Sequence, residues 1–549
     1  MKMLPLTLLL AAVTLILAST SSGGDARGVQ PKTNFIILFA DDLGYGDLSS
    51  YGHPTSETPN IDSLASSGVR FTQWYSGHPL CSPSRASMLT GRLPSRNGMA
   101  GGNMFGGVLM PNSVGGLPSN ETTIASLLKK SGYRTKAVGK WHMGTSPEHF
   151  PTSHGFDSYY GVPYSTDMGV SAWDSSGDGA QPLPLIRSVK DQPGSYEIIE
   201  QPTDLNLLSD RYIEEAVSFI TDETDEEPFL LYLPFNHVHV PNHASEKFCN
   251  STTRGVYGDA LAELDDAVGQ ILKSLDESNQ RENTMVFFTS DNGPWLLEKL
   301  AGGSAGLLRD GKSTTWEGGV RVPGIISMGK KIKPRVERNV VATYDIFTTI
   351  AAIAGAPLEE DRVYDGVDLS TLLFSDKEEC AFETPHECIF HYKGQPWETD
   401  CGYDEGCPGL WAARCGSLKA HFVTNNSTFD GTGAFKDAVF HDPPIMFNVD
   451  RDPGENFILN STTTEYINGL KIIRKAIKQH EEGMTPVPNQ ARMGSDPSLV
   501  PCCNDDAGGC MCNEENMNVF VCNGDVEESV IRYDRSNKGR NPNSCVSDE

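Results

Sequence analysis

The fold of this chain is decided by the stretch Phe35-Ile36-Ile37-Leu38-Phe39-Ala40-Asp41-Asp42, in which an apolar run leads directly into two aspartates. A short, continuous apolar run bounded by polar residues is typical of a strand buried on both faces, as in a parallel sheet. Runs of the same character lie at residues 135–138, 229–234 and 285–289. Amphipathic helical segments separate these runs, so the sequence predicts an α/β fold with a large, mixed but mostly parallel sheet flanked by helices.

The helical segments carry clear ends and apolar faces. Thr58 precedes Pro59 as an N-cap, which predicts a helix over Pro59–Ser67. We expect a second helix over Thr122–Lys130, stopped by Gly132, and a third over Tyr257–Asp276, where aliphatic residues recur on one face. These apolar faces are expected to form the core.

Chemically active side chains follow each of the four predicted strands directly. In a parallel sheet the carboxyl ends of the strands share one edge, and ligands bind there. Residues far apart in the sequence therefore meet, and we expect a single site. Its candidate members are Asp41, Asp42, Lys140, His142, His237, His239, Asp291 and Asn292.

The acidic members predict a metal site. Asp41, Asp42 and Asp291 would repel one another unless a cation lies among them, and with the amide of Asn292 they offer the oxygen ligands that Ca²⁺ or Mg²⁺ prefers. A single Asp-Asp pair after a strand is more often a turn or a helix cap. A second such pair, Asp291-Asn292, follows another predicted strand, and the two pairs together favour metal binding. Zinc is disfavoured, because the sequence lacks the usual His/Cys spacing.

The overall charge restricts the class of ligand. A formal net charge of −28 repels nucleic acid and anionic membranes at long range. Any anion must therefore be held by a local cluster of positive charge. A single basic residue is usually solvated, but a cluster around a divalent cation would form an anion pocket. The candidates are Arg85, Lys140, His142, His239 and Lys312.

Cys81 is the candidate nucleophile. The following residues predict a helix start, with Ser82 as N-cap and Pro83 in the first turn. There the free backbone N–H groups and the helix dipole would favour an anion. The same position would activate a plain thiolate, so a cysteine hydrolase stays an alternative, although it would not explain the clustered carboxylates.

Several features predict a secreted route. Residues 1–24 have a basic start, an apolar core and a small-residue end, as in a signal peptide, and no later stretch is long and apolar enough to span a membrane. The chain has 13 cysteines, most of them near the C-terminus; without Cys81 the number is even, as disulfide pairing requires. Four glycosylation motifs begin at Asn120, Asn250, Asn426 and Asn460.

The composition of the sequence changes in its last third. Past about residue 356 it becomes rich in cysteine, glycine and proline, with one amphipathic helix expected near Glu465–His480. We therefore predict a large catalytic domain over residues 25–375 and a smaller, disulfide-rich domain and tail over residues 376–549.

Two motifs resemble the signatures of the sulfatase family. They are Cys81-Ser82-Pro83-Ser84-Arg85, extended by Leu89-Thr90-Gly91-Arg92, and the segment from Gly132-Tyr133 through Gly139-Lys140-Trp141-His142-Met143-Gly144. The resemblance to the arylsulfatases covers nearly the whole mature chain. It implies an alkaline-phosphatase-like fold and a smaller C-terminal α+β domain with an antiparallel sheet.

The resemblance also implies a reaction. Cys81 would be converted to formylglycine by a formylglycine-generating enzyme, and its hydrated form would attack the sulfur of a sulfate monoester to give a sulfated enzyme. One Ca²⁺ would be held by Asp41, Asp42, Asp291, Asn292 and the modified Cys81. The second hydroxyl of the hydrated aldehyde would then expel sulfate.

Further roles are carried over by the same resemblance. Lys140 and Lys312 would neutralise the sulfate oxygens, and Arg85 would steady the hydrated aldehyde. His142 is expected to act as the base in the elimination step. His239, chosen over His237 because His239-Val240-Pro241 matches the family's His-x-Pro pattern, would contact sulfate with Lys312 and protonate the leaving oxygen. Ser165 would also touch sulfate.

Other functions and open properties remain at this point. A phosphatase or phosphonate-ester hydrolase of the same fold would generally use Ser or Thr as nucleophile, and an extracellular glycoprotein could retain the fold with weak or no catalysis. The substrate could be a sulfolipid, a sulfated glycan or an aryl sulfate. Lysosomal and extracellular residence both fit, and sulfatases commonly form dimers, which leaves a homodimer open.

Overall fold

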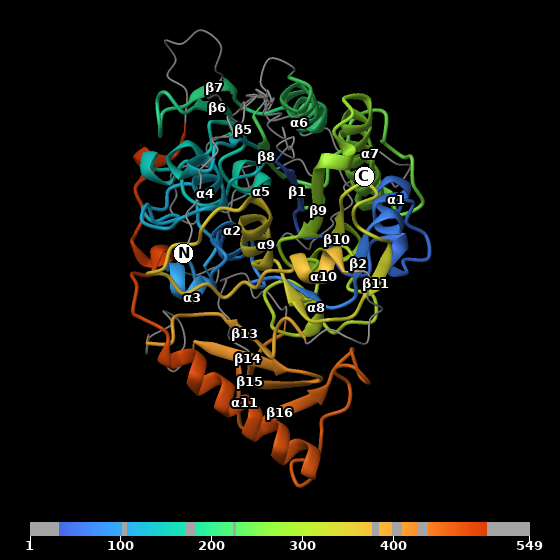
Figure 1. The fold of residues 1–549 in the computed structure, drawn as a ribbon, viewed down its shortest axis with the longest axis vertical. Helices are drawn as coiled ribbons and strands as arrows, with labels where there is room; N and C mark the ends of the chain where they lie inside the picture. Colours follow the sequence, from blue (N-terminus) through green and yellow to red (C-terminus); the bar gives the residue numbers. More distant parts are fainter. Residues whose placement is uncertain are drawn as a thin grey trace, which may run out of the picture.

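The computed structural model describes residues 32–101, 107–170, 182–222, 227–375, 384–397, 409–426 and 438–501. The predicted signal peptide and the cysteines from Cys502 onward lie outside these residues. A ten-stranded sheet forms the centre of the molecule, in the order β11-β2-β10-β9-β1-β8-β4-β5-β6-β7, and a separate small sheet lies below it in Figure 1.

The middle of the large sheet is parallel. Strand β1 (Asn34–Ala40) pairs in parallel with β8 (Phe229–Pro234) on one side and with β9 (Thr284–Ser290) on the other. Next to β8, strand β4 (Arg134–Val138) continues the parallel order to β5 (Ser158–Gly161). The four predicted strands are thus confirmed to within one residue at each end.

Burial on both faces explains the continuous apolar run in β1. Phe35, Ile37 and Phe39 enter one apolar cluster, whereas Ile36 and Leu38 enter the cluster on the opposite face of the sheet. Successive side chains of a strand point to opposite faces, so a strand covered on both sides has no polar alternation.

Both edges of the sheet contain antiparallel pairs, so the sheet is mixed, as predicted. On one edge, β10 (Gly324–Ser327) runs antiparallel to β9 and to β2 (Val69–Phe71), and β2 pairs in parallel with β11 (Arg335–Glu337). On the other edge, β6 (Leu185–Val189) is antiparallel to β5 and to β7 (Glu197–Glu200).

Helices cover the two faces of the sheet (Figure 1). The face of Ile36 packs against α1 (Pro59–Ser67), α6 (Leu205–Ile220) and α7 (Gly255–Glu277). The face of Phe35 packs against α2 (Cys81–Thr90), α4 (Ile124–Lys130) and α9 (Asp345–Ala354). Shorter elements of this domain are β3 (Trp74–Tyr75), α3 (Pro94–Asn97), α5 (Thr166–Val170), α8 (Glu317–Val320), β12 (Val341–Ala342) and α10 (Ser370–Phe374).

The helix starts show how local signals and tertiary contacts combine. Helix α1 begins at Pro59 as predicted, yet the Thr58 side chain does not cap it. Instead Asp265, from α7, accepts hydrogen bonds from the backbone N–H groups of Asn60 (3.1 Å) and Ile61 (2.8 Å). A carboxylate from another helix therefore satisfies the first free N–H groups of α1.

The smaller domain is a four-stranded antiparallel sheet covered by one helix. Its strands β13 (Cys388–Tyr392), β14 (Leu410–Cys415), β15 (Leu418–Thr424) and β16 (Val439–Asn448) pair in sequence order. Helix α11 (Thr464–Glu482) crosses the sheet, as Figure 1 shows, and confirms the helix predicted near Glu465–His480. The disulfide Cys388–Cys415 links β13 to β14.

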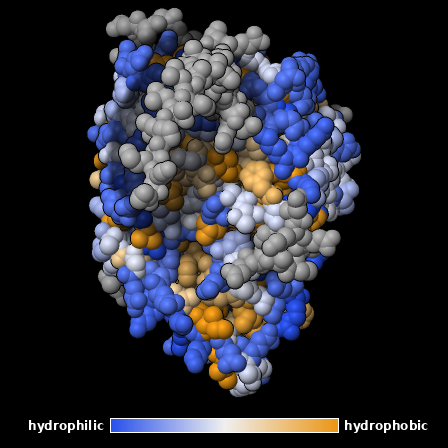
Figure 2. All heavy atoms as spheres, in the orientation of Figure 1, coloured by the Kyte–Doolittle hydropathy of each residue, from blue (hydrophilic) through white to orange (hydrophobic). Residues whose placement is uncertain are grey.

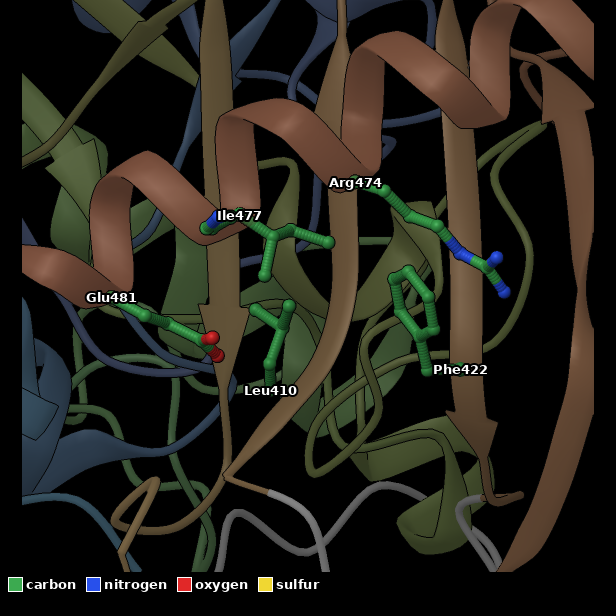
Figure 3. A pocket seen from close by; sticks show the side chains of 6 residues that line it. Leu410, Phe422, Arg474, Ile477 and Glu481 are labelled. Carbon is green, nitrogen blue, oxygen red and sulfur yellow. The ribbon is translucent and has the colours of Figure 1, made fainter.

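A groove remains between α11 and this sheet. Leu410 and Phe422 from the sheet face Ile477 from the helix in Figure 3, and the volume is about 330 Å³. Arg474 and Glu481 also line the groove. On the face shown in Figure 2, apolar side chains gather near the centre and at the lower end, within a mostly hydrophilic surface.

The two domains are joined by apolar and polar contacts. Tyr75 and Val320 of the large domain pack with Ile389 and Tyr392 of the small one. After α11 the chain returns to the large domain, where the N–H of Gln490 donates to the Gly98 carbonyl at 2.9 Å. Within the described residues, no helix is both long enough and apolar enough to cross a membrane.

The structure shows the exposure of the predicted glycosylation motifs and the state of several cysteines. The asparagines of all four glycosylation motifs, Asn120, Asn250, Asn426 and Asn460, are exposed. Cys249 is disulfide-bonded, like Cys388 and Cys415. Among the cysteines that the structure describes, Cys81 alone is free, and it is buried.

Candidate active site

The parallel register brings the predicted site residues to one edge of the sheet. At the carboxyl ends of the strands, Ala40 of β1 lies opposite Ser290 of β9, and Phe39 lies opposite Pro234 of β8. The segments that follow these strands therefore start side by side. The site residues carried over from sequence are at most 7% exposed; they are Asp41, Asp42, Cys81, Arg85, Lys140, His142, Ser165, His239, Asp291, Asn292 and Lys312.

The acidic side chains are linked to one another. Asp291 Oδ1 accepts a hydrogen bond from the backbone N–H of Asp42 at 3.1 Å, and Asn292 Nδ2 donates to Asp42 Oδ1 at 2.7 Å. Asp42 has a φ of 59°, a conformation that is uncommon for a residue with a side chain. Such local strain often marks functional sites, where the surroundings enforce it.

Three cationic side chains lie against the three carboxylates. Lys140 Nζ lies 2.5 Å from Asp41 Oδ2, and Lys312 Nζ lies 2.7 Å from Asp42 Oδ2. Arg85 donates to Asp291 Oδ2 from Nη2 at 2.8 Å, and this same nitrogen lies 3.2 Å from Asp41 Oδ1. With all three carboxylates ionised, the side-chain charges balance, and an added cation would then give the site a net positive charge for an anion.

The charges determine which groups ionise. Burial alone would raise the pKa of Asp41, but Lys140 and Arg85 outweigh it and hold this pKa well below its ordinary value. Burial, together with the nearby charge of Asp41, raises the pKa of Asp291 to about 7. The pKa values of Asp41 and Asp291 are thus shifted in opposite directions, although both carboxylates contact Arg85.

Cys81 is the first residue of α2, next to this cluster. Its thiol lies 3.7 Å from Asp41 Oδ1 and donates to it. Burial raises the pKa of the Cys81 thiol well above its usual range, against the opposing effect of Lys140 and Lys312. An unmodified Cys81 is thus held as the neutral thiol, which is a poor nucleophile. This environment argues against the cysteine-hydrolase alternative.

The predicted cap of α2 was wrong. The helix starts at Cys81 rather than at Pro83, with Leu80 in the cap position. The Ser82 hydroxyl instead accepts a hydrogen bond from the backbone N–H of Leu109 at 3.2 Å. This contact with a distant segment replaces the local cap.

The structure brings together a group of candidate metal ligands. Asp41, Asp42, Cys81 and His239 offer ligand atoms that all lie within 4.8 Å of one another. In addition, Asn292 Oδ1 is buried and has no hydrogen-bond partner. A buried carbonyl oxygen without a donor is costly, and a cation beside the two aspartates would satisfy it. Asp291 lies outside the 4.8 Å group and pairs with Arg85.

The structure separates the two candidate histidines after β8. His239 Nε2 lies 3.0 Å from Lys312 Nζ and 3.5 Å from Asp42 Oδ2, so His239 belongs to the site. His237 instead pairs with Glu263, with 2.8 Å between Nε2 and Oε2, and its ring packs on His243. Of the two, only His239 can therefore reach a ligand held by Lys312.

His142 and Ser165 complete the inner site. Ser165 Oγ accepts a hydrogen bond from Lys140 Nζ at 3.0 Å. His142 Nε2 lies 3.0 Å from the Leu109 carbonyl and donates to it, which leaves the buried Nδ1 without a partner. Burial and the nearby charge of Lys140 lower the pKa of His142 well below its ordinary value. His142 is thus a neutral imidazole with a free acceptor nitrogen, as a general base requires.

Sequence reasoning missed Trp295 and Glu263. The indole of Trp295 lies beside Lys312 and His239, with 4.4 Å from Lys312 Nζ to the ring centroid. Its position three residues after Asn292 was a signal that could have identified it. Glu263 lies within α7, and no local pattern links it to His237.

Comparisons with known proteins identify relatives of the chain. The family model described as "Sulfatase" matches residues 33–356, and the model for the "C-terminal region of aryl-sulfatase" matches residues 384–512. The chain is 39% identical to arylsulfatase A of Homo sapiens over 495 residues, which are 86% of this chain and 92% of that protein. It is 34% identical to steryl-sulfatase of Homo sapiens, with 88% and 94% covered.

A solved structure shares the fold. The PsFucS1 sulfatase from Pseudoalteromonas sp. superposes with a TM-score of 0.71 at 29% identity, and the match covers 82% of this chain and 90% of that one. The fold is therefore the alkaline-phosphatase-like fold with its separate C-terminal antiparallel domain, as predicted. With a matching family model over residues 33–356 and relatives of this similarity, the chain belongs to the sulfatase family and is a sulfatase enzyme.

Proposed function

We propose that this sulfatase cleaves sulfate monoesters at the site around Cys81, with Cys81 converted to formylglycine and one Ca²⁺ bound nearby. One observation carries the proposal: Cys81 is a free, buried cysteine at the start of α2, and its Sγ lies 3.7 Å from Asp41 Oδ1 within the cluster of opposed charges. An unmodified Cys81 thiol, held neutral at this position, would be a poor nucleophile.

The formylglycine would supply, as a hydrated aldehyde, one hydroxyl to attack sulfur and a second to release sulfate without an external water. Because Cys81 is only 1% exposed in the folded chain, we place its conversion by a formylglycine-generating enzyme before folding is complete. The start of α2 then holds the modified side chain beside Asp41.

Asp41, Asp42, Asp291 and Asn292, with the modified Cys81, are the proposed ligands of Ca²⁺. The ion would supply electrostatic stabilisation of the sulfate oxygens. The oxygen-rich donor set and the unpartnered Asn292 Oδ1 support this assignment. His239 Nε2 also lies within the group of candidate ligand atoms, but its contact with Lys312 favours a role toward the substrate.

The remaining side chains act on the sulfate group and on protons. Lys140, supported by Ser165, and Lys312 would hold the sulfate oxygens, and such fixed charges in a buried site are strongly stabilising. His239, 3.0 Å from Lys312 Nζ, would give a proton to the leaving oxygen. His142 would take a proton at Nδ1 in the release step. Arg85, through its ion pairs with Asp291 and Asp41, would fix these carboxylates and steady the hydrated residue.

The proposed substrates are sulfate esters in which one oxygen of the sulfate carries a lipid, a glycan or an aryl group. The predicted signal peptide and the exposed glycosylation motifs support residence in the secretory pathway, and from there in the lysosome or outside the cell. We also propose a homodimer, and this proposal rests only on the resemblance to the family.

The test uses the full chain produced in a eukaryotic secretory pathway. We expect it to hydrolyse 4-nitrophenyl sulfate, and we expect Cys81→Ser to fold with an unchanged circular dichroism spectrum but to turn over at background rate. 4-Nitrophenyl phosphate, assayed in parallel, should be a poor substrate. A wild-type protein without sulfatase activity would instead support an inactive glycoprotein with this fold.

A further inference from the structure

Trp295 lies at the edge of the site, next to the two groups assigned to the leaving oxygen. Its ring centroid is 5.6 Å from that of His239, with an interplanar angle of 53°, and Lys312 Nζ lies 4.4 Å from the indole centroid. Unlike the inner residues, Trp295 is only half-buried, so part of its ring remains accessible.

Backbone hydrogen bonds hold the segment that carries Trp295. Trp295 follows Pro294, whose carbonyl accepts a hydrogen bond from the Lys312 N–H at 2.9 Å. The Trp295 carbonyl in turn accepts from the N–H of Glu298 at 3.0 Å and opens the short 3-10 helix Leu296–Ala301. The segment that carries Trp295 is thus tied to the segment that carries Lys312.

Lys312 does not depend on the indole for its position. Its ammonium group contacts Asp42 Oδ2 at 2.7 Å and His239 Nε2 at 3.0 Å. The contact with the Trp295 ring is therefore additional to these two contacts. An aromatic residue on such a segment, partly accessible and not needed as an anchor, is available to bind a ligand.

We propose that Trp295 is a specificity-determining residue that packs against the ring of the leaving group. The inference rests on the proposed function, in which His239 and Lys312 contact the leaving oxygen. The group attached to that oxygen must then begin within a few ångströms of the indole. Aromatic rings pack favourably at centroid distances of about 4.5–7 Å. The site therefore favours aryl sulfates over small acyclic sulfate esters.

The experiment compares a substrate that has a ring with a ligand that has none. In Trp295→Ala we expect kcat/KM for 4-nitrophenyl sulfate to fall about three- to tenfold, the range expected for a lost aromatic contact. The inhibition constant of inorganic sulfate, which occupies only the anion pocket, should stay within about twofold. Trp295→Phe should keep most of the wild-type kcat/KM.

A matched control is Phe457→Ala, at an aromatic residue that is 77% exposed and lies in the smaller domain, and it should behave like the wild type. Equal losses for the aryl ester and for inorganic sulfate would show that Trp295 merely positions Lys312, and would overturn the proposal. An active wild type with an unchanged Trp295→Ala variant would overturn it as well. A wild type without aryl sulfate turnover would overturn the proposed function and this inference with it.

Discussion

Lys419 and Glu317 form an ion pair that is completely buried, with 2.9 Å between Nζ and Oε1. Lys419 lies on β15 of the smaller domain, whereas Glu317 begins α8 of the large domain, five residues after Lys312. Glu317 also accepts a hydrogen bond from the Tyr75 hydroxyl at 2.6 Å. The small domain is therefore bound electrostatically to the segment that delivers a proposed sulfate-binding lysine.

Removing one partner of this pair should destabilise the fold. In Lys419→Met, Glu317 would stay buried without its main counter-charge, so we expect the free energy of unfolding to fall by about 3–5 kcal/mol. Urea unfolding followed by tryptophan fluorescence measures this change. The double variant Lys419→Met/Glu317→Gln should recover only part of the loss: Glu317 no longer carries a buried charge, but Arg321 and Glu455 each lose a charged partner.

The exposed pair Lys273–Glu277 provides the control for this prediction. Both side chains are more than 60% exposed, at 72% and 66%, so Lys273→Met should change the stability by less than about 1 kcal/mol. Equal effects of Lys273→Met and Lys419→Met would contradict the importance given to the buried pair.

The pair of Glu263 with His237 predicts a pH dependence of stability. Burial raises the pKa of Glu263, but the hydrogen bond and charge of His237 outweigh it and lower this pKa from 4.5 to about 2. A depressed folded pKa stabilises the native state above the ordinary pKa, and the effect disappears as the pH falls toward 2. Glu263→Gln should therefore be less stable by about 2 kcal/mol near neutral pH.

Urea unfolding of the wild type and of Glu263→Gln over a series of pH values checks this expectation. The difference in unfolding free energy should be constant above about pH 5 and should shrink steadily below it. A difference that stays the same down to the acid limit of folding would show that the charge of Glu263 is not responsible.

Removal of the metal should affect both activity and stability. We expect exhaustive chelation to abolish aryl sulfate hydrolysis and to lower the thermal midpoint, because a ligand that binds only the native state stabilises it by about 3 kcal/mol at a hundredfold excess over its Kd. Ca²⁺ should restore both properties. Asn292→Ala should raise the Ca²⁺ concentration needed for half-maximal activity. Full activity in protein shown by elemental analysis to be metal-free would refute the assignment.

The two histidines after β8 should give different phenotypes. His239→Gln should lower kcat by about 10²–10⁴, and by more for sulfate esters with poor leaving groups, since these need the proton most. His237→Gln, which breaks the contact with Glu263, should mainly lower the unfolding midpoint and leave kcat per folded molecule nearly unchanged. Steady-state kinetics and thermal unfolding of both variants separate the roles, and a reversed pattern would reject them.

The fold could be predicted for those elements whose sequence pattern depends on burial alone. Strand β1 is covered on both faces, so its apolar run needs no knowledge of its neighbours. Edge strands such as β7, whose residues are exposed or half-buried, carry a weaker pattern and were not predicted. The start of α2 was misplaced because Ser82 bonds to Leu109, a contact that only the folded chain creates.

The candidate site could also be predicted in part, and the residues near the ends of predicted strands were the easiest to find. Asp41 and Asp291 follow their strands directly, and His142 lies four residues after β4, so the geometry of a parallel sheet brings them together. Ser165 required the resemblance to a family, because β5, which ends four residues before it, was not predicted from the sequence. Trp295 lies three residues after Asn292, but its contacts with His239 and Lys312 join segments far apart in the sequence.

The central claim is that Cys81 carries an aldehyde in the mature enzyme, and mass spectrometry of the peptide spanning Cys81 tests it most directly. The protein should come from a eukaryotic secretory pathway, with Cys81→Ser digested in parallel as the reference. The account predicts that most of the wild-type peptide carries formylglycine and reacts with an aldehyde-specific hydrazide. An intact thiol at position 81 in a fully active preparation would contradict it.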